Sequence, residues 1–331
     1  MKKVNLADIA AALNISQSTV SRALRNKPGV NPQLREEVFK MAQALNYPFP
    51  LPKSPAMKRV GIIIPDLSNP FFATVCYGIE SVMRSNGYFT YLVNTDEDWE
   101  LENSYLQSFI DDDKVEGLII APSANTERIY NDLLGTLPFI FFDRYYDALN
   151  VQSVIIDNEG AVFRATQYLV ETGHTNICFV AGSDNISTGR SRTRGFLEAI
   201  NLLGLDREKC AIVDGDFKEP KSYEGAKRIL AEGECTAVIA TSNKTTWGVM
   251  RAVRDLRLSI PGDVNVIGFD SQDWTEFSDN PIATIVQPAF TMGNLAASLL
   301  LQQINGREFS SENVVLKAEI KNSNPKLSIS L

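Results

Sequence analysis

The spacing of apolar residues changes from a helical pattern to a strand-like one about sixty residues into the chain. Before that point apolar residues recur three and four positions apart, which predicts three short amphipathic helices. We expect helices at 6–13, at 17–24 and from residue 32 onward, each preceded by a polar residue that can cap its N-terminus. Beyond residue 58, short apolar runs alternate with amphipathic segments. That alternation is typical of parallel strands covered by helices.

The alternating part of the chain consists of two similar series. Strands are predicted at 60–64, 88–93, 117–120 and 139–142, and again at 177–180, 211–213, 237–239 and 265–267. Helices are predicted at 71–86, 100–109, 192–203, 221–231 and 246–256. We therefore expect an α/β fold, with a three-helix head followed by a body of two parallel-sheet lobes. A ligand would bind between the lobes, at the carboxyl ends of the strands.

The head has the pattern of a DNA-reading helix-turn-helix. Its second helix would expose Gln17, Ser18, Ser21 and Arg22 while Val20, Ala23 and Leu24 face inward. A glutamine such as Gln17 can pair with adenine, and an arginine such as Arg22 can bond to the edge of guanine. Ser16, Ser21 and Asn5 are better suited to phosphate contacts. The alternative is a three-helix bundle whose polar face is merely hydrated.

The distribution of charge favours the DNA-binding interpretation. The chain has 331 residues and a net charge of −8. Residues 1–59 nevertheless carry ten basic and three acidic residues, a net charge of +7, whereas the remainder carries −15. A basic head suits a polyanionic partner, and an acidic body would keep the rest of the molecule away from it.

At this point the sequence resembles the lactose-repressor (LacI) family of regulators. The resemblance lies in Val4-x-Leu6-x-Asp8-Ile9-Ala10, in Ile15-Ser16-x-x-Thr19-Val20-Ser21-Arg22-Ala23-Leu24 and in Leu45-Asn46-Tyr47, and it continues through the whole chain. It implies that Gln17, Ser18 and Arg22 read bases and that Ser16 and Ser21 lie near phosphates. It also implies a homodimer with contacts near 72–84. We expect domains at 1–47 and 59–331, joined by a linker at 48–58.

The linker departs from the family pattern. It is about four residues shorter than usual and has prolines at 48, 50, 52 and 55. Each proline removes a helical hydrogen-bond donor and costs about 3 kcal/mol inside a helix. We therefore predict an extended, polyproline-type spacer in place of the family's hinge helix. Insertion of Leu51 or Phe49 into the minor groove is the less favoured alternative.

Polar and aromatic residues collect directly after the predicted strands of the body. Phenylalanine rings can stack on a sugar, while carboxylates, amides and arginines can bond to its hydroxyl groups. The set resembles that of ribose-type periplasmic sugar-binding proteins, which implies sugar contacts from nine residues: Asn69, Phe71, Phe72, Asp143, Arg144, Arg192, Phe217, Asp270 and Gln287. Ser242 and Asn243 follow another strand and complete the predicted effector site. Asn243 stands where the LacI family usually has an aspartate. Phe71 or Phe72 alone would more often be a core residue.

Other chemistry finds little support in the sequence. One histidine, His174, without a nucleophile motif around it, argues against hydrolytic catalysis, and no dinucleotide fingerprint is present. We predict no cofactor and no metal site. The four cysteines are expected to be free thiols, and Asp111–Asp113 a solvated turn. No apolar run is long enough for a membrane span and no signal peptide is recognisable, so we expect a cytoplasmic protein.

The combined prediction is a DNA-binding transcriptional regulator, by family default a repressor, that is not an enzyme. Its operator affinity would change when a small sugar or sugar derivative binds between the lobes. Two alternative predictions assign the protein to other functional classes. One is a cytoplasmic sugar-binding protein without regulatory DNA binding, and the other is an enzyme such as a dehydrogenase.

Overall fold

The computed structural model describes residues 5–24, 29–45, 47, 58–124, 127–131, 133–270, 282–306 and 312–322. The chain divides into two compact units, Met1–Met57 and Lys58–Leu331, each of which is described by itself. The predicted linker at 48–58 lies outside the described residues except for Lys58. Its polyproline conformation and the domain limits around it therefore stay predictions.

The first unit holds the three predicted helices, α1 (Leu6–Leu13), α2 (Gln17–Leu24) and α3 (Pro32–Ala44). Asn5 caps α1, because its Oδ1 accepts from the backbone nitrogen of Ala7 at 2.8 Å. In turn, the Asp8 carboxylate accepts from the backbone nitrogen of Asn5. Ser16 caps α2 by accepting from the nitrogen of Thr19 at 3.1 Å. Each cap satisfies backbone donors that a helix start leaves open. A small core of buried side chains closes the unit: Ile9, Ala10, Val20, Ala23, Val38 and Ala42.

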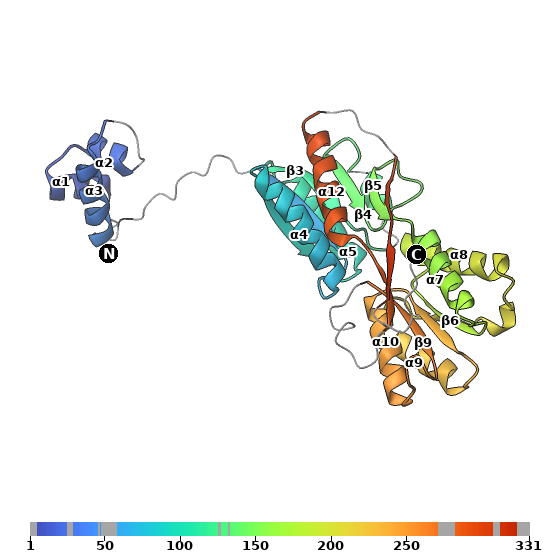
Figure 1. The fold of residues 1–331 in the computed structure, drawn as a ribbon. Coiled ribbons are helices and arrows are strands. Elements are labelled where there is room, and N and C mark those ends of the chain that lie inside the picture. The colour runs from blue at the N-terminus through green and yellow to red at the C-terminus, as the bar shows by residue number, and fades with distance from the viewer. Residues whose placement is uncertain are drawn as a thin grey trace. The chain divides into compact units, whose positions relative to one another are not determined.

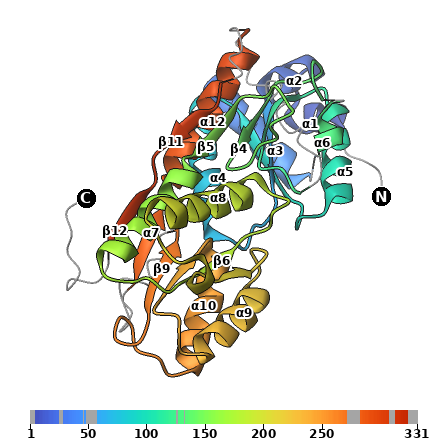
Figure 2. The same cartoon turned by 90° about the vertical axis from the view of Figure 1, so that its right-hand side faces the viewer.

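The second unit contains two six-stranded sheets (Figures 1 and 2). The strands of the first sheet are β1 (Arg59–Ile64), β2 (Phe89–Asn94), β3 (Val115–Ile120), β4 (Phe139–Phe142), β5 (Ser153–Ile156) and β11 (Val314–Leu316). Those of the second are β6 (Ile177–Ala181), β7 (Ile212–Asp214), β8 (Ala237–Ala240), β9 (Asn265–Phe269), β10 (Ala283–Val286) and β12 (Glu319–Asn322). We call the first sheet with its helices the N-lobe and the second the C-lobe.

The two sheets have the same strand order. It is β11-β5-β4-β3-β1-β2 in the N-lobe and β12-β10-β9-β8-β6-β7 in the C-lobe. Every pair is parallel except β10 with β12. In both sheets the order reverses beside the first strand, so a crevice opens there at the carboxyl ends. The predicted α/β architecture with two similar lobes is confirmed.

Helices cover both faces of each sheet. The helices of the N-lobe are α4 (Pro70–Ser85), α5 (Trp99–Ile110), α6 (Glu127–Asn131) and α12 (Ala289–Ile304); those of the C-lobe are α7 (Asn158–Glu171), α8 (Ser187–Leu202), η1 (Arg207–Lys209), α9 (Glu219–Ala231) and α10 (Asn243–Asp255). Helices α4 and α12 lie side by side (Figure 1). A Cβ added to Gly78 would lie 2.4 Å from the Phe290 carbonyl oxygen, so this close crossing needs glycine.

The chain passes between the lobes three times. It leaves the N-lobe after β5 to form α7, returns after β10 to form α12, and crosses again between β11 and β12. The largest core cluster accordingly includes residues of both lobes, such as Ile62 and Ile267. Strands β5, β10, β11 and β12 and helices α6, α7 and α12 were not predicted, and α8 begins five residues before the predicted start at 192.

Candidate functional site

A cavity of about 420 Å³ lies between the lobes at the carboxyl ends of their strands. Ten of the eleven predicted effector residues line it: Asn69, Phe71, Phe72, Asp143, Arg144, Arg192, Phe217, Ser242, Asp270 and Gln287. The eleventh, Asn243, lines a neighbouring hollow of about 290 Å³ that shares Asp270 and Gln287. Predicted effector residues from the N-lobe and from the C-lobe therefore line the same cavity.

Two buried carboxylates occupy matching positions in the two lobes. Asp143 follows β4 and Asp270 follows β9. Burial raises the pKa of both groups, and that of Asp270 to about 6, against the attraction of nearby arginines. Asp270 accepts from Gln287 Nε2 at 2.6 Å, whereas Gln287 Oε1 is buried without a hydrogen-bond partner. The cavity thus contains acceptors that hydroxyl donors of a ligand could satisfy.

The two arginines of the cavity have different surroundings. Arg192 donates through Nε to Asn158 at 2.7 Å and through a terminal nitrogen to the Thr241 carbonyl oxygen at 2.6 Å. Its guanidinium also lies 3.8 Å from the centre of the Phe269 ring. Burial lowers the pKa of Arg192, and the attraction of Asp143 and Asp270 opposes this shift only in part.

The guanidinium of Arg144 is instead bound by an acid. Both of its terminal nitrogens donate to Glu97, at 2.9 and 2.8 Å. Burial alone would lower the pKa of Arg144, but the Glu97 carboxylate reverses this and raises it. The Nε atom of Arg144 is buried without a hydrogen-bond partner and lies 3.6 Å from Asp143.

Three aromatic rings form apolar walls of the cavity. Phe71 and Phe72 meet edge to face with ring centroids 5.2 Å apart at the start of α4, and both are buried. They therefore pack in the core and line the cavity at the same time. The Phe217 ring occupies space that a Cβ on Gly182 would take, since that carbon would lie 2.0 Å from the ring.

Left-handed backbone conformations gather around this cavity. Among the described residues, eight other than glycine have positive φ, and six of them line the cavity: Asp96, Glu97, Asp143, Asp216, Phe217 and Asp270. Such conformations cost about 1–3 kcal/mol each and concentrate at functional sites. Asp96 and Glu97 were missed by sequence reasoning, although they follow strand β2 directly after Asn94 and Thr95.

Direct contacts join the two lobes beside the cavity. Lys244 of α10 forms an ion pair of 2.6 Å with Asp66 of the N-lobe. Asn243 Nδ2 donates to Asn69 Oδ1 at 2.7 Å, and the same Asn69 oxygen caps α4 by accepting from the Phe71 nitrogen. These bonds hold the lobes in one relative arrangement and would have to break if the lobes opened.

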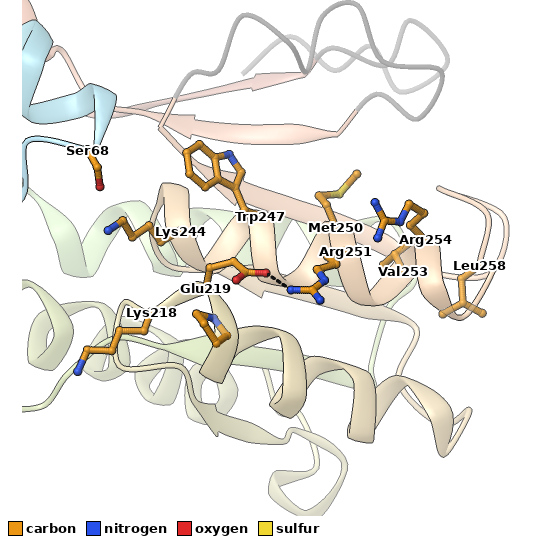
Figure 3. Close-up of a pocket in the computed structure, with 11 residues that line it drawn as sticks. Ser68, Lys218, Glu219, Lys244, Trp247, Met250, Arg251, Val253, Arg254 and Leu258 are labelled. Carbon is orange, nitrogen blue, oxygen red and sulfur yellow. Dashed lines mark hydrogen bonds and ion pairs between the residues drawn. The ribbon is translucent and has the colours of Figure 1, made fainter.

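A second hollow, of about 840 Å³, is lined mainly by residues of the C-lobe and also by Ser68 of the N-lobe (Figure 3). It runs along α10, where Trp247 and Met250 provide apolar surface, and its Arg251 is ion-paired with Glu219 at 3.0 Å. Lys218 and Lys244 line both this hollow and the cavity between the lobes. The hollow is larger, but it contains none of the predicted effector residues.

The predicted reading helix α2 exposes three of the four side chains expected on its outer face. Gln17, Ser18 and Arg22 of α2 are exposed, and Ser21 is half-buried. The hydroxyl of Ser16 lies 2.7 Å from that of Ser18 besides capping α2. Asn5 and Ser16 therefore already have structural hydrogen bonds, and a phosphate contact would compete with them.

The remaining sequence features have structural partners. The ring of His174 contacts Thr236 at 3.1 Å, and Asp112, within the acidic run, pairs with Arg59 at 2.7 Å. The four cysteines are free thiols, as expected. Within the described ranges, no helix is long and apolar enough to cross a membrane, and no group of three or more potential ligands is arranged to hold a metal ion.

Comparison with known proteins identifies the class. Residues 57–324 match the model of periplasmic binding proteins and the sugar-binding domain of the LacI family, and residues 5–48 match that of bacterial regulatory proteins of the lacI family. The chain therefore belongs to the LacI family. It is a DNA-binding transcriptional regulator with a sugar-binding domain.

Individual relatives match between 80% and 96% of the chain. Catabolite control protein A of Priestia megaterium is 30% identical over 325 residues, 96% of this chain and 98% of its own length. A LacI family transcriptional regulator from Enterococcus faecium, solved with bound ribose, is 28% identical with a TM-score of 0.72, covering 80% of this chain and 97% of its own. A periplasmic binding protein/LacI transcriptional regulator from Alkaliphilus metalliredigens QYMF, complexed with D-xylulofuranose, is 25% identical with a TM-score of 0.70 and covers 80% and 97%.

Proposed function

We propose that this regulator responds to a pentose, with ribose as the first compound to test, bound in the cavity between the lobes. The observation that carries the proposal is the convergence of ten predicted sugar-contacting residues on one cavity of about 420 Å³. The bound pentoses of the Enterococcus faecium and Alkaliphilus metalliredigens structures support the choice of sugar. Phe71, Phe72 and Phe217 would stack on the ring, while Asp143, Asp270 and Arg192 would bond to its hydroxyl groups.

Operator recognition belongs to α2 in this proposal. Gln17, Ser18 and Arg22 contact base edges, because their side chains are exposed on one face of the helix. Ser16, Ser21 and Asn5 lie near the DNA backbone. A protein that binds through such contacts shows a steep loss of affinity with increasing salt.

We infer a homodimer from the surface of the N-lobe. Strand β2 is an edge strand with exposed Phe89, Tyr91 and Leu92. Tyr77 of α4 is 64% exposed, with its ring centroid 5.5 Å from that of Phe290 on α12. Exposed apolar side chains beside an open strand edge are typical of protein interfaces. Two half-sites on DNA would match the twofold axis of such a dimer.

The effector and the operator are linked through the relative position of the lobes. A sugar that binds the closed arrangement adds its contacts to the Asp66–Lys244 and Asn69–Asn243 bonds. Its differential affinity for the two arrangements shifts operator binding, with a typical coupling of about 1–3 kcal/mol. The sign of regulation depends on which arrangement binds the operator.

The deciding experiment combines two measurements on the purified full-length protein. Isothermal titration calorimetry with ribose tests the cavity, and selection of bound duplexes from a random pool, followed by gel shift with and without ribose, tests the coupling. We expect ribose binding and a ribose-dependent change in affinity for the selected duplex. Absence of ribose binding would contradict the proposed effector, while failure to enrich any duplex at low salt would contradict the assigned role of α2.

A further inference from the structure

The charged groups that line the cavity are mostly acidic, and its two lysines are already ion-paired. Its lining has six acidic residues, Asp66, Asp96, Glu97, Asp143, Asp216 and Asp270, against the four basic residues Arg144, Arg192, Lys218 and Lys244, a net charge of −2. Lys244 is paired with Asp66 and Lys218 with Asp216, at 2.6 and 2.9 Å. The charges of the two lysines are therefore already balanced by carboxylates. Arg144 and Arg192 are the other basic residues of the lining that could bind an anionic ligand.

Glu97 occupies both terminal nitrogens of Arg144, an arrangement that would also fit an anionic ligand. A guanidinium binds carboxylate or phosphate through two parallel hydrogen bonds. In Arg144 both terminal nitrogens already donate to the two oxygens of Glu97. One terminal nitrogen also donates to the Pro122 carbonyl oxygen at 3.2 Å. The Nε atom has no hydrogen-bond partner and lies 3.6 Å from Asp143, a position that suits a single hydroxyl oxygen of a neutral ligand.

The backbone around Glu97 indicates that this ion pair is built into the fold. Asp96 and Glu97 are consecutive residues with φ of 51° and 63°. Left-handed conformations of non-glycine residues persist only where the surroundings compensate for them. The loop between β2 and α5 is fixed at its ends by Thr95, whose nitrogen bonds to the Ile64 carbonyl oxygen, and by the Asp98 cap of α5.

We propose that Glu97 determines the charge preference of the cleft, so that an uncharged sugar binds and its phosphorylated or carboxylate form is rejected. Glu97 acts through Arg144 and is therefore a positioning and selectivity residue. An anionic ligand would have to displace the Glu97 carboxylate from Arg144 and then lie beside it. The proposal rests on the proposed sugar-binding function, whose effector it defines more narrowly.

The first test compares D-ribose with D-ribose 5-phosphate by calorimetry. The wild-type protein should bind ribose at least about tenfold more tightly than the phosphate. Glu97→Gln removes the charge but keeps the length, and should narrow that ratio by about tenfold, the scale of one unit charge beside a buried guanidinium. Glu100→Gln, an exposed substitution in the first turn of α5, is the matched control and should leave the ratio unchanged.

The second test does not depend on the sugar. Inorganic phosphate, compared with chloride at equal ionic strength, should raise the melting temperature of Glu97→Gln and Glu97→Gly more than that of the wild type. Glycine at position 97 also suits the left-handed backbone, which guards against a folding defect. Adding Arg144→Met to Glu97→Gln should abolish the extra response, because the freed guanidinium is then gone.

The outcomes separate the two proposals. If the ratio of the two affinities is unchanged in Glu97→Gln, or if both Glu97 variants respond to phosphate no more than the wild type, the charge-selection proposal is wrong. If ribose does not bind but phosphate stabilises the Glu97 variants through Arg144, the ribose assignment fails while the charge-selection proposal stands.

Discussion

Gly182→Ala should impair effector binding far more than folding. The added Cβ would lie 2.0 Å from Cζ and 2.2 Å from Cε1 of Phe217, whereas ordinary carbon contacts are about 3.5–4.0 Å. The Phe217 ring must therefore move by about 1.5 Å. Because Phe217 lines the cavity, the ring would move into the space that the ligand needs. Overpacking of this kind costs about 1–3 kcal/mol. If that cost falls on the bound state, ribose affinity drops roughly 5- to 150-fold.

The assay for Gly182→Ala is ribose calorimetry together with urea unfolding. Gly225→Ala on α9 is the matched control, since its Cβ would lie 2.1 Å from Val213 Cγ1, away from the cavity. We expect the control to lower the free energy of unfolding without changing ribose affinity. Ribose affinity within twofold of wild type in Gly182→Ala would refute the assignment of Phe217 as a wall of the effector site.

Three further predictions address the division of labour, the titration of the cavity and the linker. Arg192→Ala should abolish the ribose response while gel shifts still show duplex binding, and Arg22→Ala should do the reverse; parallel loss of both activities in either variant would contradict separate sites. Ribose affinity should fall between pH 7.5 and pH 5.0, because Asp270, with its pKa of about 6, loses an acceptor on protonation. Its pKa is higher in the folded state than the ordinary value of about 3.9, so this group should make the ribose-free body more stable as the pH falls from about 6 toward 4; urea unfolding of Asp270→Asn should lack that rise. Leu51→Ala should weaken operator binding only slightly in gel shifts, whereas a large loss would favour insertion of Leu51 into the minor groove.

The sequence sufficed for the elements with strong local signals. Polar caps at Asn5, Ser16 and Asn31 marked the helix starts of the head, and continuous apolar runs marked eight strands of the body. The predicted site residues converged because each follows a strand, and strand ends of two similar parallel sheets meet in space. The site residues could therefore be predicted together although they lie far apart in the sequence.

The missed features depend on long-range contacts. Strands β11 and β12 have only three and four residues, and their partners β5 and β10 lie far back in the chain. Glu97 became a site residue only through an ion pair with Arg144, 47 positions away. Nothing in the local sequence around Glu97 distinguishes it from a solvated acid.

The three passages of the chain between the lobes make the body inseparable. Truncation after α12 would remove β11 from one sheet and β12 from the other at once. No single stretch of sequence contains a whole lobe, so neither half can be produced alone by shortening the chain. A protease that cuts one passage would leave two others as tethers, and the nicked fragments should migrate together until they are denatured.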